Sequence, residues 1–358
     1  MTINFKSLIS KFKKLKALLR DRGLFGAYNF LYDLYFLKNY PCSIKIEITT
    51  RCNLSCIMCP HGYSNFGLWE GANKDMSFEK FKTIIDNFHG LKLIDFAGTG
   101  ENFLNKDFMK MVRYAKSKNI LVDFFSNFCL VDENISKELI EIGINKIYLS
   151  IDGATKETYE KIRVGSDFEK VINNVKNFFR LKKEQNKQFP YIVFNYVVNK
   201  YNFNEIIDFV ELVSSLAEGQ KTLIIFKNMF PLLFSGFLEK EFKNIILPQK
   251  IINEVKRRSE ELNISVGWEN NMFRGKPLID KCNYYLRPFI SIDGEVYFCC
   301  VSRSLRSSQK KMILGNIFEY NFKEIWQSKE YKNFRKLLHR GKTPFCCKNC
   351  YYYDTDKD

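Results

Sequence analysis

Alternation of short apolar runs with amphipathic stretches, from residue 43 to about 227, constrains the fold more than any other feature. Strands are expected at Ile44–Ile48, Leu93–Ala97, Leu121–Phe125, Lys146–Ile151, Ile192–Val198 and Leu223–Phe226. Helices are expected at about 77–88, 106–118, 133–142, 155–184 (with a break near Gly165), 203–217 and 248–262. Such alternation is typical of parallel strands joined by crossover helices. Six such units predict an α/β fold, a partial (β/α)6 TIM-like barrel.

The 358 residues are enough for this barrel and an appended module. We expect a basic amphipathic helical segment at 1–40, the barrel at 41–230, a connection at 231–280 and a small cysteine-rich domain at 281–358. Apolar residues recur at helical spacing between residues 5 and 20, with lysines around them. This stretch either lies at a membrane surface as a peripheral contact or packs against the barrel.

Three cysteines follow the first expected strand in the pattern C-x3-C-x2-C: Cys52, Cys56 and Cys59. Thiolates are the protein ligands of iron–sulfur clusters. Three thiolates leave one iron of a [4Fe–4S] cluster without a protein ligand, so that iron is open to a chelating small molecule. Zinc is the alternative, but structural zinc sites usually have four ligands.

The net charge is +16, which favours anionic partners or an acidic electron donor unless it only reflects a lysine-rich composition. No stacking-aromatic plus basic motif stands out, so we expect no nucleic-acid partner. The N-terminus lacks the features of a signal peptide, and no apolar run reaches about 18 residues. These features predict a cytoplasmic protein that uses some of its 11 cysteines for metal binding rather than for disulfides.

The loop from Arg51 to Cys59, with Asn53 and Leu54, resembles that of the radical S-adenosylmethionine (SAM) enzymes. The resemblance implies that the open iron binds SAM and that an electron from a donor such as flavodoxin or ferredoxin cleaves it. The resulting 5′-deoxyadenosyl radical would abstract a substrate hydrogen. Met58 stands where the family commonly has an aromatic residue, and its sulfur can pack against adenine.

Polar residues follow the next expected strands, where barrel enzymes carry their active sites. Gly98-Thr99-Gly100-Glu101 resembles the family's Gly-Gly-Glu-Pro element, which binds the SAM amino group, although Thr99 and Asn102 depart from it. By the same resemblance, Gly98, Gly100 and Glu101 are expected SAM contacts.

Further SAM contacts are implied at Asn127, Ser150, Asp152, Arg163 and Asn195. Asn127 follows the third expected strand, and Ser150-Ile151-Asp152-Gly153 resembles the family's ribose-contacting element. Arg163 matches an arginine that often reaches the SAM carboxylate, with a solvated charge as the alternative. Asn195 faces either SAM or a packed polar core.

The C-terminal cysteines form a second pattern, which resembles a shortened SPASM or twitch domain holding one auxiliary [4Fe–4S] cluster. The implied ligands are Cys282, Cys299, Cys347 and Cys350, with Cys300 or Cys346 as alternatives within the adjacent pairs. Asp293 to Cys299 reads as a hairpin that delivers a ligand. The chain stops at Asp358, so a second auxiliary cluster is not expected. The alternative is an all-cysteine zinc site.

Two [4Fe–4S] clusters and SAM predict a radical SAM oxidoreductase. A fully ligated auxiliary cluster favours electron transfer, hence two-electron oxidation of an alcohol on a sugar or amino-cyclitol. The alternatives are modification of a ribosomally made peptide and a non-enzymatic electron carrier. The substrate is therefore a small molecule or a peptide, and no catalytic residue is assigned from the sequence.

Overall fold

The computed structural model describes residues 40–59, 73–228, 245–268, 286–300, 313–340, 342–344 and 347. The expected helix at 5–20 and the expected ligands Cys282 and Cys350 lie outside these ranges, as does Cys346.

One ten-stranded sheet organises the described residues, in the order β10-β9-β8-β1-β2-β3-β4-β5-β6-β7. Strands β1 to β7 pair in parallel, β8 is parallel to β1, and β9 and β10 continue the edge antiparallel. The strands are β1 (Ser43–Ile46), β2 (Leu93–Phe96), β3 (Leu121–Ser126), β4 (Lys146–Ser150), β5 (Tyr191–Val198), β6 (Thr222–Asn228), β7 (Ser265–Trp268), β8 (Phe289–Ile290), β9 (Glu295–Tyr297) and β10 (Ile313–Asn316).

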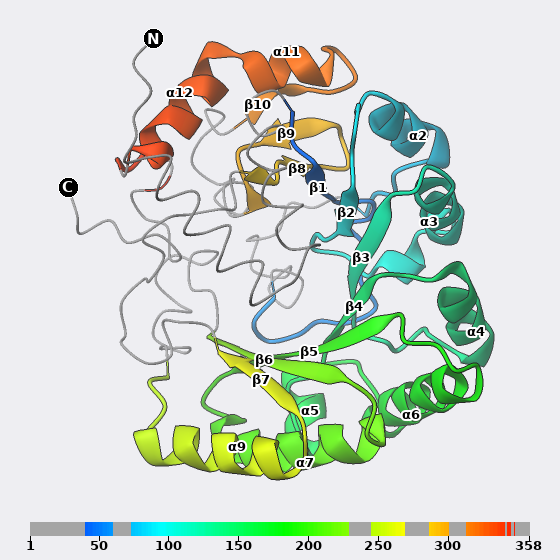
Figure 1. The fold of residues 1–358 in the computed structure, drawn as a ribbon, viewed down its shortest axis with the longest axis vertical. Helices are drawn as coiled ribbons and strands as arrows, with labels where there is room; N and C mark the ends of the chain where they lie inside the picture. Colours follow the sequence, from blue (N-terminus) through cyan, green and yellow to red (C-terminus); the bar gives the residue numbers. More distant parts are fainter. Residues whose placement is uncertain are drawn as a thin grey trace, which may run out of the picture.

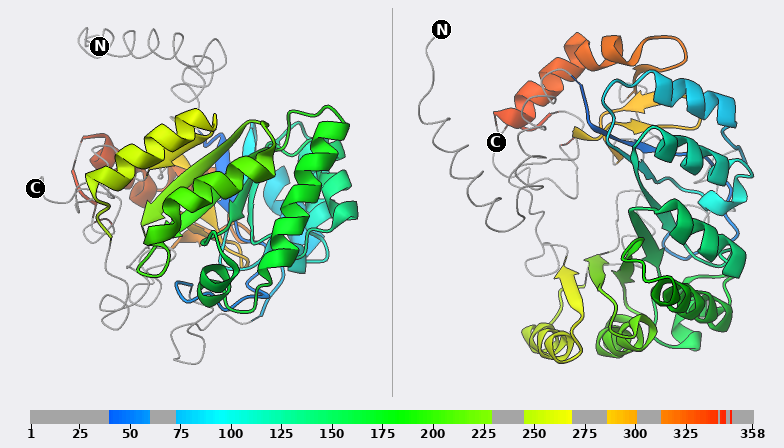
Figure 2. Two further views of the ribbon diagram at one scale, coloured as in Figure 1. Left: turned by 90° about the horizontal axis from the view of Figure 1, so that it is seen from below. Right: turned by 45° about the vertical axis from the view of Figure 1, so that its right-hand side comes forward.

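Helices line the outer, convex side of this curved sheet (Figure 1). They are α2 (Phe78–Asp86), α3 (Phe108–Ser117), α4 (Glu133–Ile142), α5 (Lys156–Ile162), α6 (Phe168–Glu184), α7 (Ile206–Ala217) and α9 (Gln249–Glu261), with short 3-10 helices η2 (Asn102–Leu104) and η3 (Phe203–Glu205). Helices α11 (Phe322–Gln327) and α12 (Lys329–His339) lie beside β8–β10 (Figure 2). Side-chain caps fix several starts, as where Asp132 accepts from the Ile135 N–H and begins α4.

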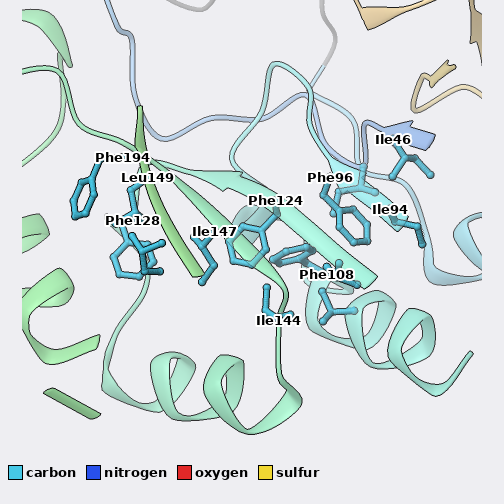
Figure 3. Close-up of a cluster of buried hydrophobic side chains, with 14 of the residues drawn as sticks. Ile46, Ile94, Phe96, Phe108, Phe124, Phe128, Ile144, Ile147, Leu149 and Phe194 are labelled. Atoms are coloured by element: carbon cyan, nitrogen blue, oxygen red, sulfur yellow. The ribbon is translucent and has the colours of Figure 1, made fainter. Parts of the chain in front are cut away.

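The main core lies between the convex face of the sheet and these helices (Figure 3). Alternate strand residues fill it, among them Ile46, Ile94, Phe96, Phe124, Ile147, Leu149 and Phe194, all at most 1% exposed. Because successive strand side chains point to opposite faces, the residues between them lie on the concave face. The concave face therefore carries Lys45, Asp95, Asp123, Tyr148 and Asn195.

The partial barrel and all six expected strands are confirmed. A seventh parallel strand, β7, was not expected. The break near Gly165 is confirmed, since α5 ends at Ile162 and α6 begins at Phe168. The sequence also suggests one helix from about Phe322 to Leu338, but the structure has two helices there, because the extended Ser328 ends α11 and caps α12.

A capping box at Asn202 and Glu205 is also suggested by the sequence, and it is wrong. The Asn202 amide instead donates to the Asp152 and Val197 carbonyls, and Glu205 accepts from Ala154 and Thr155.

Among the described residues, no helix has the length and apolar character needed to cross a membrane.

Candidate active site

The three-cysteine loop follows β1 and is held by backbone hydrogen bonds to two other segments. Ser55 and Ile57 donate to the carbonyls of Val164 and Ile162, just beyond and at the end of α5, at 2.9 and 3.0 Å. The Glu101 N–H donates to the Arg51 carbonyl at 2.8 Å, which joins the loop to the turn after β2. The loop geometry is thus set by the ends of β2 and α5.

Burial disfavours the thiolate forms of Cys52 and Cys56 when no metal is bound. It raises the pKa of the Cys52 thiol to about 11 and also raises that of Cys56, which is buried. A metal deprotonates a coordinating thiol outright, so ligation would resolve this cost. Among the described residues, no three His, Cys, Asp or Glu side chains lie close enough together to hold a single metal ion. The donor chemistry fits an iron–sulfur cluster, which is much larger than one ion.

The turn after β2 is packed directly against the cysteine loop. A Cβ on Gly100 would lie 2.4 Å from the Thr49 carbonyl oxygen and 2.6 Å from that of Arg51. A Cβ on Gly98 would meet the Glu47 side chain at 2.5 Å. Thr99, which departs from the family pattern, donates its N–H and hydroxyl to Glu47 Oε1, both at 2.9 Å. Glycine is therefore required on both sides of Thr99 by close approach.

Glu101 is a buried carboxyl at the centre of the strand ends. It accepts from the Asn127 N–H at 2.8 Å, the Ser126 hydroxyl at 3.0 Å and the Phe103 N–H at 3.4 Å. Burial nevertheless raises its pKa to about 7. A bound cation would favour the ionised carboxylate and lower this pKa, which fits the expected role of Glu101 toward an amino group.

Asn127 joins the third strand to the cysteine loop. Its Nδ2 donates to Asn53 Oδ1 at 2.9 Å, and its Oδ1 accepts from the Cys129 N–H. Cys129 is buried, and its sulfur lies 3.3 Å from the Ser166 hydroxyl. The Asn127 side chain thus helps to position the cysteine loop through Asn53.

Asp152 and Arg163 form a buried ion pair beside the loop. Arg163 Nε and Nη2 lie 2.8 and 2.6 Å from Asp152 Oδ2, and Arg163 Nη1 lies 3.8 Å from Cys56 Sγ. The alternative of a solvated Arg163 is wrong, since its side chain is 10% exposed and that of Asp152 is 0%.

Ser150 and Asn195 are neighbours on the concave face, because their strands pair at these two residues. Asn195 is 5% exposed, and neither atom of its amide has a hydrogen-bond partner among the described residues. A buried amide left unpaired is costly, so this position calls for a polar ligand. Met58 is half-buried against the core edge.

The described part of the C-terminal region places three of the cysteines named from the sequence. The hairpin expected around Gly294 is confirmed, with β8 and β9 antiparallel, and it leads to Cys299 and Cys300. Both are partly buried, whereas Cys347 is buried. The aromatic rings of Phe298, Tyr331 and Phe334 pack together beside the hairpin. The choice between adjacent cysteines stays a prediction.

Sequence reasoning missed a row of charges on the concave face. Backbone register aligns Lys45, Asp95, Asp123 and Lys146 across β1 to β4. Lys45 Nζ lies 2.9 Å from Asp95 Oδ2, while Asp95 Oδ1 is buried without a hydrogen-bond partner among the described residues. Glu47 was missed as well. The signal was present, because charged residues alternate with apolar ones in each of these strands.

The fold and the site define an iron–sulfur enzyme built on a partial barrel. The family model of the radical SAM superfamily matches residues 46–213, and that of the SPASM iron–sulfur cluster-binding domain matches residues 282–351. The chain is therefore a radical SAM enzyme with a SPASM-type domain, and this pair of domains implies SAM and two [4Fe–4S] clusters. The second match begins at Cys282 and ends one residue after Cys350.

Two curated relatives match over most of their length. A tungsten-containing aldehyde ferredoxin oxidoreductase cofactor-modifying protein of Pyrococcus furiosus is 26% identical over 85% of each chain. An AdoMet-dependent heme synthase of Methanosarcina barkeri is 25% identical over 88% of this chain and 90% of its own.

Among solved structures, Streptococcus suis SuiB bound to SAM superposes with a TM-score of 0.64 at 15% identity. The match covers 93% of this chain and 79% of SuiB. SuiB has also been solved with its precursor peptide SuiA, with a TM-score of 0.63 at 16% identity over 88% of this chain and 72% of SuiB. These likenesses show the fold.

Proposed function

We propose that the carboxyl ends of β1 to β5 form the SAM-cleaving site and that the enzyme carries out a two-electron oxidation of a polar substrate. The observation that supports this most is the convergence of the cysteine loop, Glu101 and Asn195 at these strand ends. When bound, SAM and the clusters supply reductive cleavage, hydrogen abstraction and an acceptor for the substrate's second electron.

Each residue of the site has a proposed part. Cys52, Cys56 and Cys59 ligate the cluster, and Glu101 accepts from the SAM ammonium group. Gly98 and Gly100 let the turn approach the loop. The predicted SAM surroundings are completed by Met58, Asn127, Ser150, Asp152, Arg163 and Asn195. Asn195 supplies an amide that has no hydrogen-bond partner within the part of the chain that the structure describes.

The auxiliary cluster is proposed at Cys282, Cys299, Cys347 and Cys350. Four thiolates saturate it, so it cannot bind substrate through iron without losing a ligand. Electron acceptance is its remaining role, which supports an oxidation. The proposed electron donor is a flavodoxin or ferredoxin, and the proposed compartment is the cytoplasm. A peripheral membrane contact through residues 5–20 stays a prediction.

The concave face favours a substrate with several hydroxyl or amino groups. One carboxylate oxygen of Asp95 has no hydrogen-bond partner in the described ranges, and the Lys45 and Lys227 ammonium groups lie 5.7 and 5.8 Å from the Phe125 ring centre. Phe125 stacks on Tyr148 at 4.5 Å. Charged donors and acceptors beside an aromatic surface suit a sugar or amino-cyclitol.

The second candidate is modification of a ribosomally made peptide. SuiB, which shares the fold, binds its precursor peptide SuiA. Recognition of a peptide could be supplied by a separate partner protein.

Deuterium transfer separates the two candidates. Reduced enzyme with SAM would be supplied with sugars and amino-cyclitols deuterated at carbon, and in parallel with peptides deuterated at Cα and Cβ. The proposal predicts deuterium in 5′-deoxyadenosine from a carbinol position and none in the Cys56→Ala control. Transfer from peptides alone would establish the second candidate in its place.

A further inference from the structure

We propose that Arg163 and Asp152 set the reduction potential of the cluster held by the three-cysteine loop, Arg163 raising it and Asp152 lowering it. This role concerns the cluster ligand Cys56 rather than SAM, and it rests on the proposed ligation of the cluster by Cys52, Cys56 and Cys59.

The contacts lead from one side chain to the next. Arg163 Nη1 donates toward Cys56 Sγ at 3.8 Å, a hydrogen-bonding distance for sulfur. Its Nε and Nη2 are both directed to the same oxygen of Asp152. The other Asp152 oxygen accepts from the Val197 N–H at 2.6 Å. Both Asp152 oxygens therefore accept from protein donors, and Asp152 holds the guanidinium toward the cysteine.

The backbone fixes this alignment. Ser55 and Ile57, which flank Cys56, donate to the carbonyls of Val164 and Ile162, which flank Arg163. These two hydrogen bonds hold Cys56 and Arg163 opposite each other. Gly165 lies close by, where an added Cβ would be 3.5 Å from the Asn53 carbonyl oxygen. The Arg163–Cys56 contact is thus built into the loop.

Electrostatics gives the two side chains opposite effects. Reduction of a [4Fe–4S] cluster adds one negative charge, which is shared with its thiolate ligands. A fixed cation that donates to a ligand sulfur favours the reduced state, and hydrogen bonds to sulfurs and net charge are known determinants of cluster potential. The buried Asp152 carboxylate opposes reduction from the far side of the guanidinium. Burial limits solvent screening of both charges.

The test is an EPR-monitored redox titration of the reconstituted full-length enzyme without SAM. The signal of the auxiliary cluster is subtracted using the Cys52→Ala/Cys56→Ala/Cys59→Ala variant. Arg163→Gln should lower the reduced-to-oxidised ratio at a fixed solution potential at least tenfold, equivalent to 59 mV for one electron. Asp152→Asn should raise that ratio by about threefold or more. A structural role for the ion pair would shift both variants in the same direction or leave both unchanged.

Controls keep each outcome informative. Lys161→Gln removes an exposed cation from the last turn of α5, two residues before Arg163, and should leave the potential unchanged. Arg163→Lys keeps the charge with fewer donors and should fall between wild type and Arg163→Gln. If Arg163→Gln does not retain iron, the potentials measured for Asp152→Asn and Arg163→Lys test the proposal instead. A lowered or unchanged potential in Asp152→Asn overturns it. Failure of the proposed function differs, because the triple cysteine variant would then keep the full wild-type signal.

Discussion

The convex and concave faces of the sheet are built from neighbouring residues of the same strands, yet they differ in almost every property. On the convex face, strand residues such as Phe96, Phe124 and Ile147 are fully buried against helices. On the concave face, the adjacent positions Asp95, Phe125 and Tyr148 are charged or only partly buried aromatic residues. Stability is concentrated on one face, and the chemistry is placed on the other.

The polar groups of the concave face also differ in how well the protein satisfies them. Asn202 and Asp152, which lie in the loops that follow β5 and β4, form hydrogen bonds through each of their side-chain polar atoms. Asn195 and Asp95 Oδ1 do not, among the described residues. Because buried polar groups are normally paired, the unsatisfied ones mark where ligands belong.

Substitution of Phe124 and Phe125 gives the strongest test of the difference in stability between the two faces. Phe124→Ala should destabilise the protein by about 3–5 kcal/mol, because it leaves a cavity among Phe103, Phe108 and the sheet. Phe125→Ala should cost only about 1–2 kcal/mol, mainly the stacking on Tyr148. Denaturant unfolding of both variants measures the difference. Equal losses would contradict the assignment of stability to the convex face.

Glu101→Gln tests the cost of an ionised group at the site. The folded-state pKa of about 7 lies above the usual 4.5, so the folded protein holds a proton between these values that the unfolded chain has released. Stability therefore falls as pH rises from 4.5 to 7, by about 3 kcal/mol in all.

Without SAM, Glu101→Gln should accordingly stabilise the enzyme by about 2 kcal/mol at pH 8, less the loss of charged hydrogen bonds, and this gain should vanish toward pH 4.5. The same variant should weaken SAM binding about tenfold or more, because it removes a charge-assisted contact. Thermal unfolding against pH and equilibrium SAM binding are the measurements. A loss of stability at pH 8 with unchanged SAM affinity would argue against this role for Glu101.

Two buried asparagines give the smallest but cleanest contrast. Without SAM, Asn195→Leu should stabilise the protein by about 1 kcal/mol, because it removes an unpaired buried amide. Asn202→Leu should destabilise it by about 2 kcal/mol or more, because it leaves partners of Asn202 at Asp152, Val197 and Asn199 unsatisfied. Opposite signs in denaturant unfolding are expected. If both variants were destabilised alike, Asn195 would be an ordinary core residue.

The sequence predicted the barrel because each strand carries its apolar residues in short runs and each helix its own at helical spacing. It did not predict β7, since Ser265–Trp268 is only four residues long and partly exposed, with Gly267 inside it. Nor could it separate α11 from α12, because Ser328 interrupts an otherwise helical pattern through its own backbone conformation.

The positions of Glu101 and Ser150 followed from the rule that strand ends carry the chemistry, and Asn195 lies within β5, paired with Ser150 at the end of β4. Their partners did not follow from it. The hydrogen bond from Thr99 to Glu47 spans 52 positions of the sequence, and the contact from Arg163 to Cys56 spans 107. Side-chain pairing over such separations depends on the packed fold rather than on local pattern.

Iron content together with SAM cleavage tests the central claim most directly. Wild-type enzyme reconstituted without oxygen should hold about eight irons per chain and release 5′-deoxyadenosine when reduced with SAM. The Cys52→Ala/Cys56→Ala/Cys59→Ala variant should keep about four irons and release none. If that variant still cleaved SAM, or kept all its iron, the three-cysteine loop would not hold the SAM-binding cluster.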